Sequence, residues 1–442
     1  GDVYKRQAGH RPGLQRTSPA RRADFQSLAA MKDSVAKHVW LVNHYAQEPG
    51  HAGGTRHFSI AEHLPESGWS ASIIAASVEL NTGRQRLVAG EKKKWESIGG
   101  IPFLWIRTPE YHGNGVGRFW NMLVFSMRVL MPSVTSKLQR PDVVVGSSVH
   151  PFAAWSGFVL ARRLGVPFVF EVRDLWPQTL VDLGRLNDKS PVTWLLRRLE
   201  IYLYRKAGRI VVLLPRAADY IVPLGISREK ICWIPNGVEM IDSTGPVYKG
   251  DDEHFTYMYF GAHGTANGLD NILRAMHEIE KSRSSSNIRL RLIGDGPMKS
   301  SLMELADSLD LSSVSFEAPV PKEDIPALAA QADAFVFPLV DAPVFKYGIS
   351  SNKLFDFMAA ARPIVFCCRA VNNPIADAGA GVTVAPGDIK SLATAMTELS
   401  QLPLEKRLVM GQLGREYVSQ RHDFRILAKN FADELNQCLT GT

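Results

Sequence analysis

The chain has 442 residues, 45% of them hydrophobic, so it is too long for one ordinary core and long enough for two domains. Basic and acidic side chains number 6 and 2 in residues 1–30, 26 and 16 in residues 31–236, and 19 and 26 in residues 237–442, giving net charges of +4, +10 and −7. A basic first half predicts an anionic partner such as a membrane surface, a lipid phosphate or nucleic acid. Solvated faces of unequal composition would give the same counts.

The N-terminal stretch argues against a signal peptide, and the cysteines argue against a structural zinc site. Residues 1–30 lack the apolar segment of a signal peptide, and we expect a disordered tail or an upstream artefact there. The four cysteines show no C-x-x-C spacing, which predicts a reduced compartment and no structural zinc. No run approaches the roughly 18 to 20 apolar residues of a spanning helix, so we expect a chain that does not cross a membrane.

Short apolar runs rich in β-formers alternate with helical patterns along the whole chain, as in a parallel sheet covered by helices. The runs of the first half are HVWLVN, SASIIAAS, IPFLWIRT, DVVVGSS, PFVFEV and RIVVLL, and those of the second are YMYFGAH, IRLRLIGDG, VSFEAP, AFVFPLV and PIVFCC. We predict an α/β fold of two Rossmann-like domains, residues 31–236 and 237–422, facing across a cleft. An amphipathic helix in residues 423–442 should pack back toward the N-terminal domain.

Ligands of parallel sheets bind beyond the carboxyl ends of the strands, so the loops there carry the candidate site residues. Gly53 and Gly54 follow the first strand and precede a helix starting near Thr55, where bare amides suit a phosphate. A simple turn explains the same pair equally well.

His150 follows a buried strand and precedes Pro151, which can occupy a first helical turn. It can donate to a sugar hydroxyl, or it can merely serve its own loop.

The segment FEVRDLWP places Arg173, Asp174 and Trp176 in one loop after a strand. These side chains offer a guanidinium, a carboxylate and a large aromatic ring. Binding sites for sugars and for phosphates use such groups. A structural Arg–Asp pair beside a packed Trp is the alternative.

The second half contains the most specific pattern, FKYGISSNKLFDFMAAARPIVF. Ser350 or Ser351 fits the N-cap of a helix, Lys353 lies in its first turn, and Asp356 follows. This arrangement could hold a diphosphate by amides and a cation without a metal, while Asp356 accepts hydrogen bonds from ribose hydroxyls. Asp356 could instead only favour the helix dipole. Glycine-rich loops at 261–268 and 294–297 can also approach a ligand closely.

Taken in order, GGTR, SSVHP, FEVRDLWP, IPNGV, the 261–268 loop, LIGDGP and SNKLFDFMA resemble glycosyltransferase family 4 over almost all of residues 38–440. The similarity is strongest to its bacterial O-antigen and capsule branch, which includes L-fucosamine transferases. The resemblance implies a GT-B fold with an acceptor-binding first domain and a nucleotide-sugar-binding second domain. It further implies a nucleoside-diphosphate-sugar donor, usually a UDP-sugar, with retention of configuration and no essential metal or cofactor.

Individual residues carry over from the family's motifs. His150 corresponds to its donor-sugar histidine and Asp356 to its ribose-binding carboxylate. Gly53, Gly54 and Gly264 resemble the loops near the diphosphate and acceptor. Val320 and Pro321 resemble the segment that contacts the base.

This sequence departs from the family at two places. The first acid of the family's paired-glutamate motif is Gly348 here, and the diphosphate clamp of Arg and Lys is Ala262 and Asn267. We therefore expect Ser351, Lys353 and the helix start around them to hold the diphosphate instead. Loss of the first acid fits a mechanism in which the leaving diphosphate accepts the acceptor's proton.

Two other functions stay open at this point. A nucleotide-sugar 2-epimerase would need acid–base carboxylates, for which Asp174 and Asp182 are the candidates. A non-catalytic nucleotide-sugar-binding protein would fit the changes at Gly348 and Ala262.

The expected partners follow from the charge and the resemblance together. They are a nucleotide-sugar, a polyprenyl-diphosphate-linked saccharide acceptor and the anionic inner face of the cell membrane, with no nucleic acid. The apolar and basic stripe of residues 118–137 could lie in the membrane interface as a helix, or it could be core.

Overall fold

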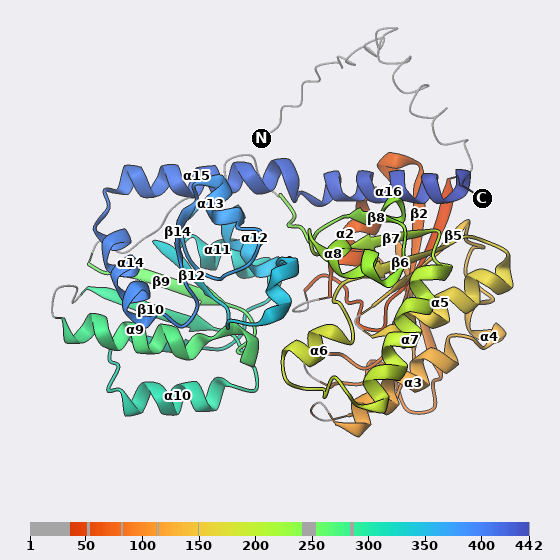
Figure 1. Cartoon of the computed structure of the whole chain (residues 1–442), viewed down its shortest axis with the longest axis horizontal. Helices are drawn as coiled ribbons and strands as arrows, with labels where there is room; N and C mark the ends of the chain where they lie inside the picture. Colours follow the sequence, from red (N-terminus) through yellow and green to blue (C-terminus); the bar gives the residue numbers. More distant parts are fainter. Residues whose placement is uncertain are drawn as a thin grey trace, which may run out of the picture.

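A computed structural model describes residues 36–50, 54–80, 83–111, 113, 115–148, 150–240, 253–282 and 287–441. The expected tail of residues 1–30 and the candidate residue Gly53 lie outside these ranges. The described residues form two α/β halves, each built on its own sheet (Figure 1). The predicted α/β fold is confirmed.

The first half contains an eight-stranded sheet of order β3-β4-β2-β1-β5-β6-β7-β8. All neighbours pair in parallel except β3 and β4, which are antiparallel. The strands are β1 (Lys37–Val42), β2 (Trp69–Ala76), β3 (Lys93–Ile98), β4 (Ile101–Ile106), β5 (Val143–Ser147), β6 (Phe168–Val172), β7 (Arg209–Val212) and β8 (Ile231–Trp233).

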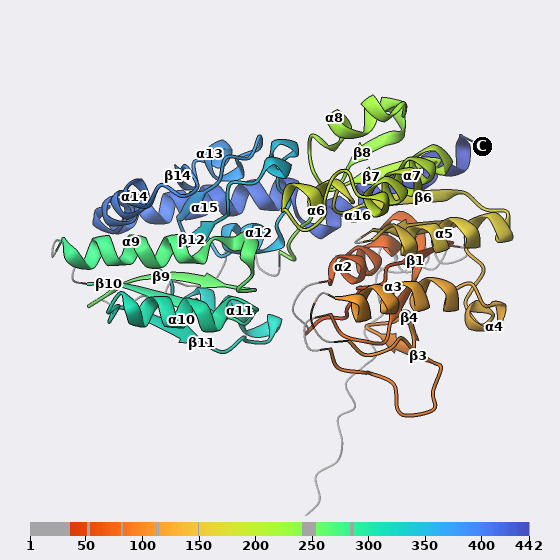
Figure 2. The same ribbon diagram turned by 60° about the horizontal axis from the view of Figure 1, so that its bottom comes forward.

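Helices cover both faces of this sheet, as its buried central strands require. On one face α3 packs on α5 and α5 on α7, and on the other α16 packs against α2 (Figures 1 and 2). The helices are α2 (Arg56–His63), α3 (Val116–Arg128), α4 (Pro132–Thr135), α5 (Pro151–Leu164), α6 (Gln178–Asp182), α7 (Pro191–Lys206), α8 (Ala217–Ile221) and α16 (Phe424–Thr440).

The second half has a six-stranded parallel sheet of order β11-β10-β9-β12-β13-β14. Its strands are β9 (Phe255–Phe260), β10 (Ile288–Ile293), β11 (Val314–Glu317), β12 (Ala334–Pro338), β13 (Ile364–Cys367) and β14 (Gly381–Val384). Its helices are α9 (Leu269–Lys281), α10 (Lys299–Ser308), α11 (Ile325–Ala329), α12 (Asn352–Ala359), α13 (Pro374–Ala378), α14 (Ile389–Gln401) and α15 (Leu404–Arg421).

The chain crosses between the halves twice, and the two crossings lie side by side. Helix α15 runs along the second half and α16 continues along the first (Figure 1). Where α15 ends, Val238 N donates to His422 O over 2.9 Å and Phe424 N donates to Val238 O over 3.3 Å. The predicted return of the C-terminal helix to the N-terminal half is confirmed, because its apolar residues join the core beneath α2.

Some elements differ from the sequence prediction. Strands β3, β8 and β14 were not expected, and the helix predicted in residues 118–137 is α3 followed by the separate short α4. Pro132 lies at the first turn of α4, where its missing N–H costs nothing, so the helical run is interrupted there. None of the helices within the described ranges is both long and apolar enough to cross a bilayer.

Candidate functional site in the cleft between the two halves

A cavity of about 460 Å³ lies between the two halves, at the carboxyl edges of both sheets. Helix α2 lines it from the first half, while α11, α12 and the turn before α11 line it from the second. Lys322 spans the gap, donating from Nζ to Thr55 Oγ1 over 3.2 Å. The lining side chains that carry charge are Glu62, Glu239, Lys322, Glu323, Asp356 and Arg415.

The loop before α2 is held close to the strand end that precedes it. Gly54 has φ +72°, and a Cβ there would lie 2.5 Å from Tyr45 O, so only glycine fits. Helix α2 begins after Thr55, as predicted. Gly54 and Thr55 are therefore held at the cleft by the backbone.

Arg56 and His57, which follow this loop, point into the protein rather than into the cleft. Both are buried and bond the buried Glu171 of β6: Arg56 Nε donates to Oε1 over 2.9 Å, and His57 Nε2 lies 2.6 Å from Oε2. Ser147 Oγ also donates to Oε2, over 2.6 Å. Burial alone would raise the pKa of Glu171, but His57 and Arg56 hold that pKa well below its usual value.

The same arginine reaches the first crossing between the halves. Arg56 Nη2 donates to Ile234 O over 3.0 Å, and Nη1 donates to Pro235 O. One buried ionic network thus ties the start of α2, strand β6 and the linker together.

His150 is the N-cap of α5 and is fully buried. Its Nδ1 accepts from Ala153 N over 3.3 Å, so the proton of the neutral ring lies on Nε2, which is 2.5 Å from His44 Nδ1. Burial, with nearby His44 and Arg118, lowers the pKa of His150 well below its usual value. Both rings are therefore neutral, and a chain of hydrogen bonds fixes their tautomers.

Arg173 and Asp174 lie in the loop after β6, and neither is among the residues that line the cavity. Arg173 N donates to Ser148 Oγ over 3.0 Å, which fixes the loop, and the Asp174 side chain is exposed. Asp182, the other acid considered for epimerisation, accepts from Gln178 Nε2 over 2.6 Å within its own helix α6.

Lys353 extends from the first turn of α12 into the loop after β9. Its Nζ donates to Tyr259 Oη over 2.7 Å and to Asn267 Oδ1 over 3.0 Å. Tyr259 Oη and Asn267 Nδ2 in turn donate to Ala262 O, over 2.9 and 2.7 Å. Ala262 and Asn267 are the positions that correspond to the family's Arg and Lys clamp. The Lys353 ammonium therefore lies beside these two positions.

No carboxylate of the described residues pairs with Lys353. Burial lowers the pKa of its ammonium to about 8. Two of its three N–H donors are used, so one remains for a ligand. Ser351 occupies the N-cap position of α12, and its side chain makes no capping hydrogen bond. The neighbouring Ser350 Oγ accepts from Asn236 N over 2.8 Å.

Asp356 follows Lys353 by three residues on α12 and lines the cavity. Burial raises the pKa of its carboxyl to about 6, although Lys322 acts in the other direction. Val320 is half-buried and Pro321 is exposed, directly before Lys322 at the cavity wall. Gly264 precedes the 3-10 turn that carries Asn267.

The backbone explains why no acid stands at position 348. Gly348 has φ +104°, and a Cβ there would lie 2.6 Å from the ring of Pro215 in the first half and 2.7 Å from Asn372 Oδ1. A glutamate would force the two halves apart at this contact.

One buried side chain was missed by sequence reasoning. His263, within the glycine-rich loop, is fully buried and has no hydrogen-bond partner at either ring nitrogen. Burial and the nearby Lys299 lower the pKa of His263 to about 4. Its position between Gly261 and Gly264 was the available signal.

One group of residues in the described part could in principle hold a metal. Glu62, His63 and Glu239 place ligand atoms within 4.8 Å of one another. His63 Nε2 bonds Glu239 Oε2 over 3.1 Å, while Glu239 Oε1 is buried without a hydrogen-bond partner among the residues that the structure describes.

Comparisons with known families now identify the fold and the reaction type. Residues 52–237 match the glycosyl transferase 4-like domain, and residues 254–401 match glycosyl transferases group 1. The probable glycosyltransferase WbjE of Pseudomonas aeruginosa is 26% identical over 335 residues, which is 72% of this chain and 79% of WbjE. The chain is a family 4 glycosyltransferase.

Solved structures show the same GT-B architecture. Sucrose-phosphate synthase from Thermosynechococcus elongatus superimposes with a TM-score of 0.70 at 15% identity, covering 92% of this glycosyltransferase and all of that chain. The Anabaena protein Alr3699/HepE in complex with UDP-glucose gives a TM-score of 0.61 at 16% identity, covering 90% and 99%. The similarity to L-fucosamine transferases stays a prediction.

Proposed function

We propose that this glycosyltransferase moves a sugar from a UDP-sugar to a lipid-linked saccharide acceptor, with retention of configuration. The observation that carries the proposal is the partly buried ammonium of Lys353, which has no counter-ion among the described residues and lies at the start of α12. An unpaired buried charge is costly, and a diphosphate would supply the missing counter-charge. The positive end of α12 acts in the same direction.

The rest of the donor fits the residues around Lys353. Asp356, three residues along the same helix, lines the cavity and would accept hydrogen bonds from ribose hydroxyls. Val320 and Pro321, directly before the cavity-lining Lys322, would contact the base. HepE binds UDP-glucose and has the same fold, which supports the choice of a UDP-sugar.

The chemistry would depend on positioning rather than on a protein nucleophile. No acid can occupy position 348, so the leaving phosphate would accept the acceptor's proton while Lys353 and the amides of α12 stabilise its charge. His150 is buried and bonds His44. It would contact the donor sugar only if the two histidines rearranged, and otherwise would act by fixing the backbone at the start of α5. We propose no metal in this step, since Lys353 supplies the cation.

The acceptor side would face an anionic membrane. Helix α3 buries Phe125 but exposes Phe119, Trp120 and Met127 by 46%, 57% and 60%. Its basic residues include Arg118 and Arg128, and no carboxylate occurs between residues 115 and 140. An apolar and cationic helix face of this kind suits a lipid interface.

Donor binding and product analysis test the proposal directly. Asp356→Asn should weaken UDP-sugar binding by about 1–3 kcal/mol, because a charged acceptor is lost from a partly buried site. Calorimetry measures this, and Asp307→Asn on the exposed face of α10 is the matched control. Unchanged affinity would contradict the ribose assignment.

Incubation with a panel of nucleotide-sugars separates the alternatives. Slow hydrolysis or transfer to an added acceptor supports the transferase. Epimerisation of the sugar would instead point to the 2-epimerase, and binding without any product to a non-catalytic protein. Binding of GDP-sugars alone would overturn the choice of base.

A further inference from the structure

The helices on the outer face of the first sheet are unusually one-sided in charge. Together α3, α5 and α7, all described in full, contain eight Arg or Lys residues and one carboxylate. That carboxylate, Glu200, is buried and accepts from Tyr204 Oη over 2.8 Å. Burial raises the pKa of Glu200 to about 8, so it is neutral near pH 7. These three helices therefore present cations and no carboxylate.

The exposed face of α7 combines these cations with aromatic rings. Trp194, Arg198, Tyr202 and Lys206 follow one another at intervals of four residues and so share one side of the helix. The Arg198 guanidinium lies 5.1 Å from the Trp194 ring centroid, and Lys206 Nζ lies 5.8 Å from that of Tyr202. Trp194 is 60% exposed, although large aromatic side chains usually find cover.

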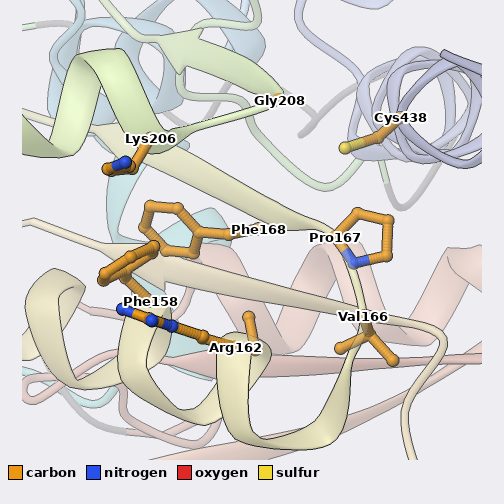
Figure 3. Close-up of a pocket in the computed structure, with 9 residues that line it drawn as sticks. Phe158, Arg162, Val166, Pro167, Phe168, Lys206, Gly208 and Cys438 are labelled. Atoms are coloured by element: carbon orange, nitrogen blue, oxygen red, sulfur yellow. The ribbon is translucent and has the colours of Figure 1, made fainter. Parts of the chain in front are cut away.

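A pocket of about 240 Å³ opens where this stripe ends. Phe158 of α5 and Phe168 of β6 form its apolar wall, and Arg162 and Lys206 lie on opposite sides of these rings (Figure 3). Neither cation pairs with a carboxylate within the described ranges, and no carboxylate lines the pocket. The Tyr202 ring meets that of Phe158 edge-on at 5.6 Å, so stripe and pocket are continuous.

The pocket is separate from the donor site. It lies at the amino edge of the first sheet, where α5 and α7 end and β6 begins, whereas the donor cleft lies at the carboxyl edge. A ligand that fits this lining would combine negative charge with an apolar part and would be distinct from the donor.

We propose that the outer face of α7 and this pocket bind anionic phospholipid, with headgroup phosphates at Arg162 and at Lys206 and acyl methylenes against the Phe158 and Phe168 rings between them. Charge complementarity selects an anionic surface, and the exposed Trp194 suits the headgroup region. This inference rests on the proposed membrane association and adds a second contact to that of α3. Two helices on the same layer would fix how the cleft sits over the bilayer.

Vesicle flotation of the full chain tests the inference. Wild-type protein should float with vesicles containing phosphatidylglycerol at low salt, less at high salt, and little with phosphatidylcholine alone. The double variant Arg162→Gln/Lys206→Gln should lower the partition coefficient roughly ten- to thirtyfold, because each cation near an anionic surface contributes to binding. The control Lys390→Gln/Lys406→Gln, on the second half, should float like wild type, and donor affinity should be the same in all three.

The outcomes separate this inference from the proposed function. Equal flotation of wild type and the Arg162/Lys206 variant would overturn the pocket assignment while membrane association stands. No flotation of the wild type would overturn both, leaving donor binding untouched. Displacement from vesicles by soluble glycerol 3-phosphate would show a site for a free phosphate ester and contradict the lipid assignment.

Discussion

Lys353, which we propose binds the donor diphosphate, should lower the stability of the free protein. Its ammonium is partly buried beside Tyr259 and Asn267 with no carboxylate partner among the described residues, and desolvation lowers its pKa from 10.5 to about 8. The unfolded chain therefore holds this proton more tightly than the folded one. The stability of the free enzyme should rise with pH between about 8 and 10.5, where only the unfolded state is protonated at this site.

We expect Lys353→Met to raise stability and lower donor affinity at once. Removing the buried charge should raise the free energy of unfolding at pH 7 by about 2 kcal/mol, measured by denaturant titration. In wild type, UDP-sugar affinity should fall by about tenfold per pH unit above pH 8, since the ammonium must be protonated to bind a diphosphate. Calorimetry across this pH range should show no such fall in affinity for Lys353→Met. The control Lys281→Met should show the same fall as wild type. A slope that survives in Lys353→Met would contradict the diphosphate assignment.

The sequence predicts Lys353 and Asp356 together because both lie within two turns of one helix, and helical spacing is visible in a single segment. It does not predict the partners of Arg56, because Glu171 and Ile234 lie more than a hundred residues away in the chain. His263 was missed for the same reason. Its burial depends on the packing of the loops after β9 and β10 rather than on its neighbours in sequence.

At the scale of elements, the network around Glu171 joins α2, β6 and the first crossing. Glu171→Gln would leave the buried Arg56 guanidinium without a counter-ion, and we expect a loss of about 3–5 kcal/mol in the free energy of unfolding. Because the folded pKa of Glu171 is depressed, this stabilisation should be present above its usual pKa of 4.5 and disappear as the pH falls through the lower folded value. Chemical denaturation at several pH values measures both effects.

The exposed Glu66 provides the control for this variant. Its side chain is 65% exposed, so Glu66→Gln should change stability by less than about 0.5 kcal/mol. A similarly small effect of Glu171→Gln would show that the network contributes little.

The main strands were predictable and the edge strands were not. Buried parallel strands such as β1 and β12 are continuous apolar runs, which stand out in sequence. Strand β3 is KKWESI, with charged residues suited to an exposed edge, and β8 has three residues. Such strands depend on a neighbour for their pairing, so their own composition does not reveal them.

For the whole molecule, the paired crossings at Val238 and His422 are the natural place for the halves to move. The His422 ring is buried and stacks on Phe355 of α12 with centroids 3.9 Å apart. A change of angle at these crossings therefore acts directly on the helix that carries Lys353 and Asp356. Closure over a bound donor would exclude water that could hydrolyse it.

Gly237 tests this role, because it lies in the first crossing and packs directly against the second. A Cβ on Gly237 would lie 2.5 Å from His422 O and 2.6 Å from Leu427 Cδ1, so Gly237→Val must push the crossings apart. We expect lower kcat together with higher KM, and loss of the donor-induced decrease in the radius of gyration measured by small-angle scattering. Gly115→Val is the control, since open space surrounds that glycine and its backbone is extended. Gly237→Ala should still fold and should change kcat, KM and compaction in the same direction but by a smaller amount. If Gly237→Ala compacts normally on binding UDP-sugar with wild-type kcat and KM, the crossings do not control closure.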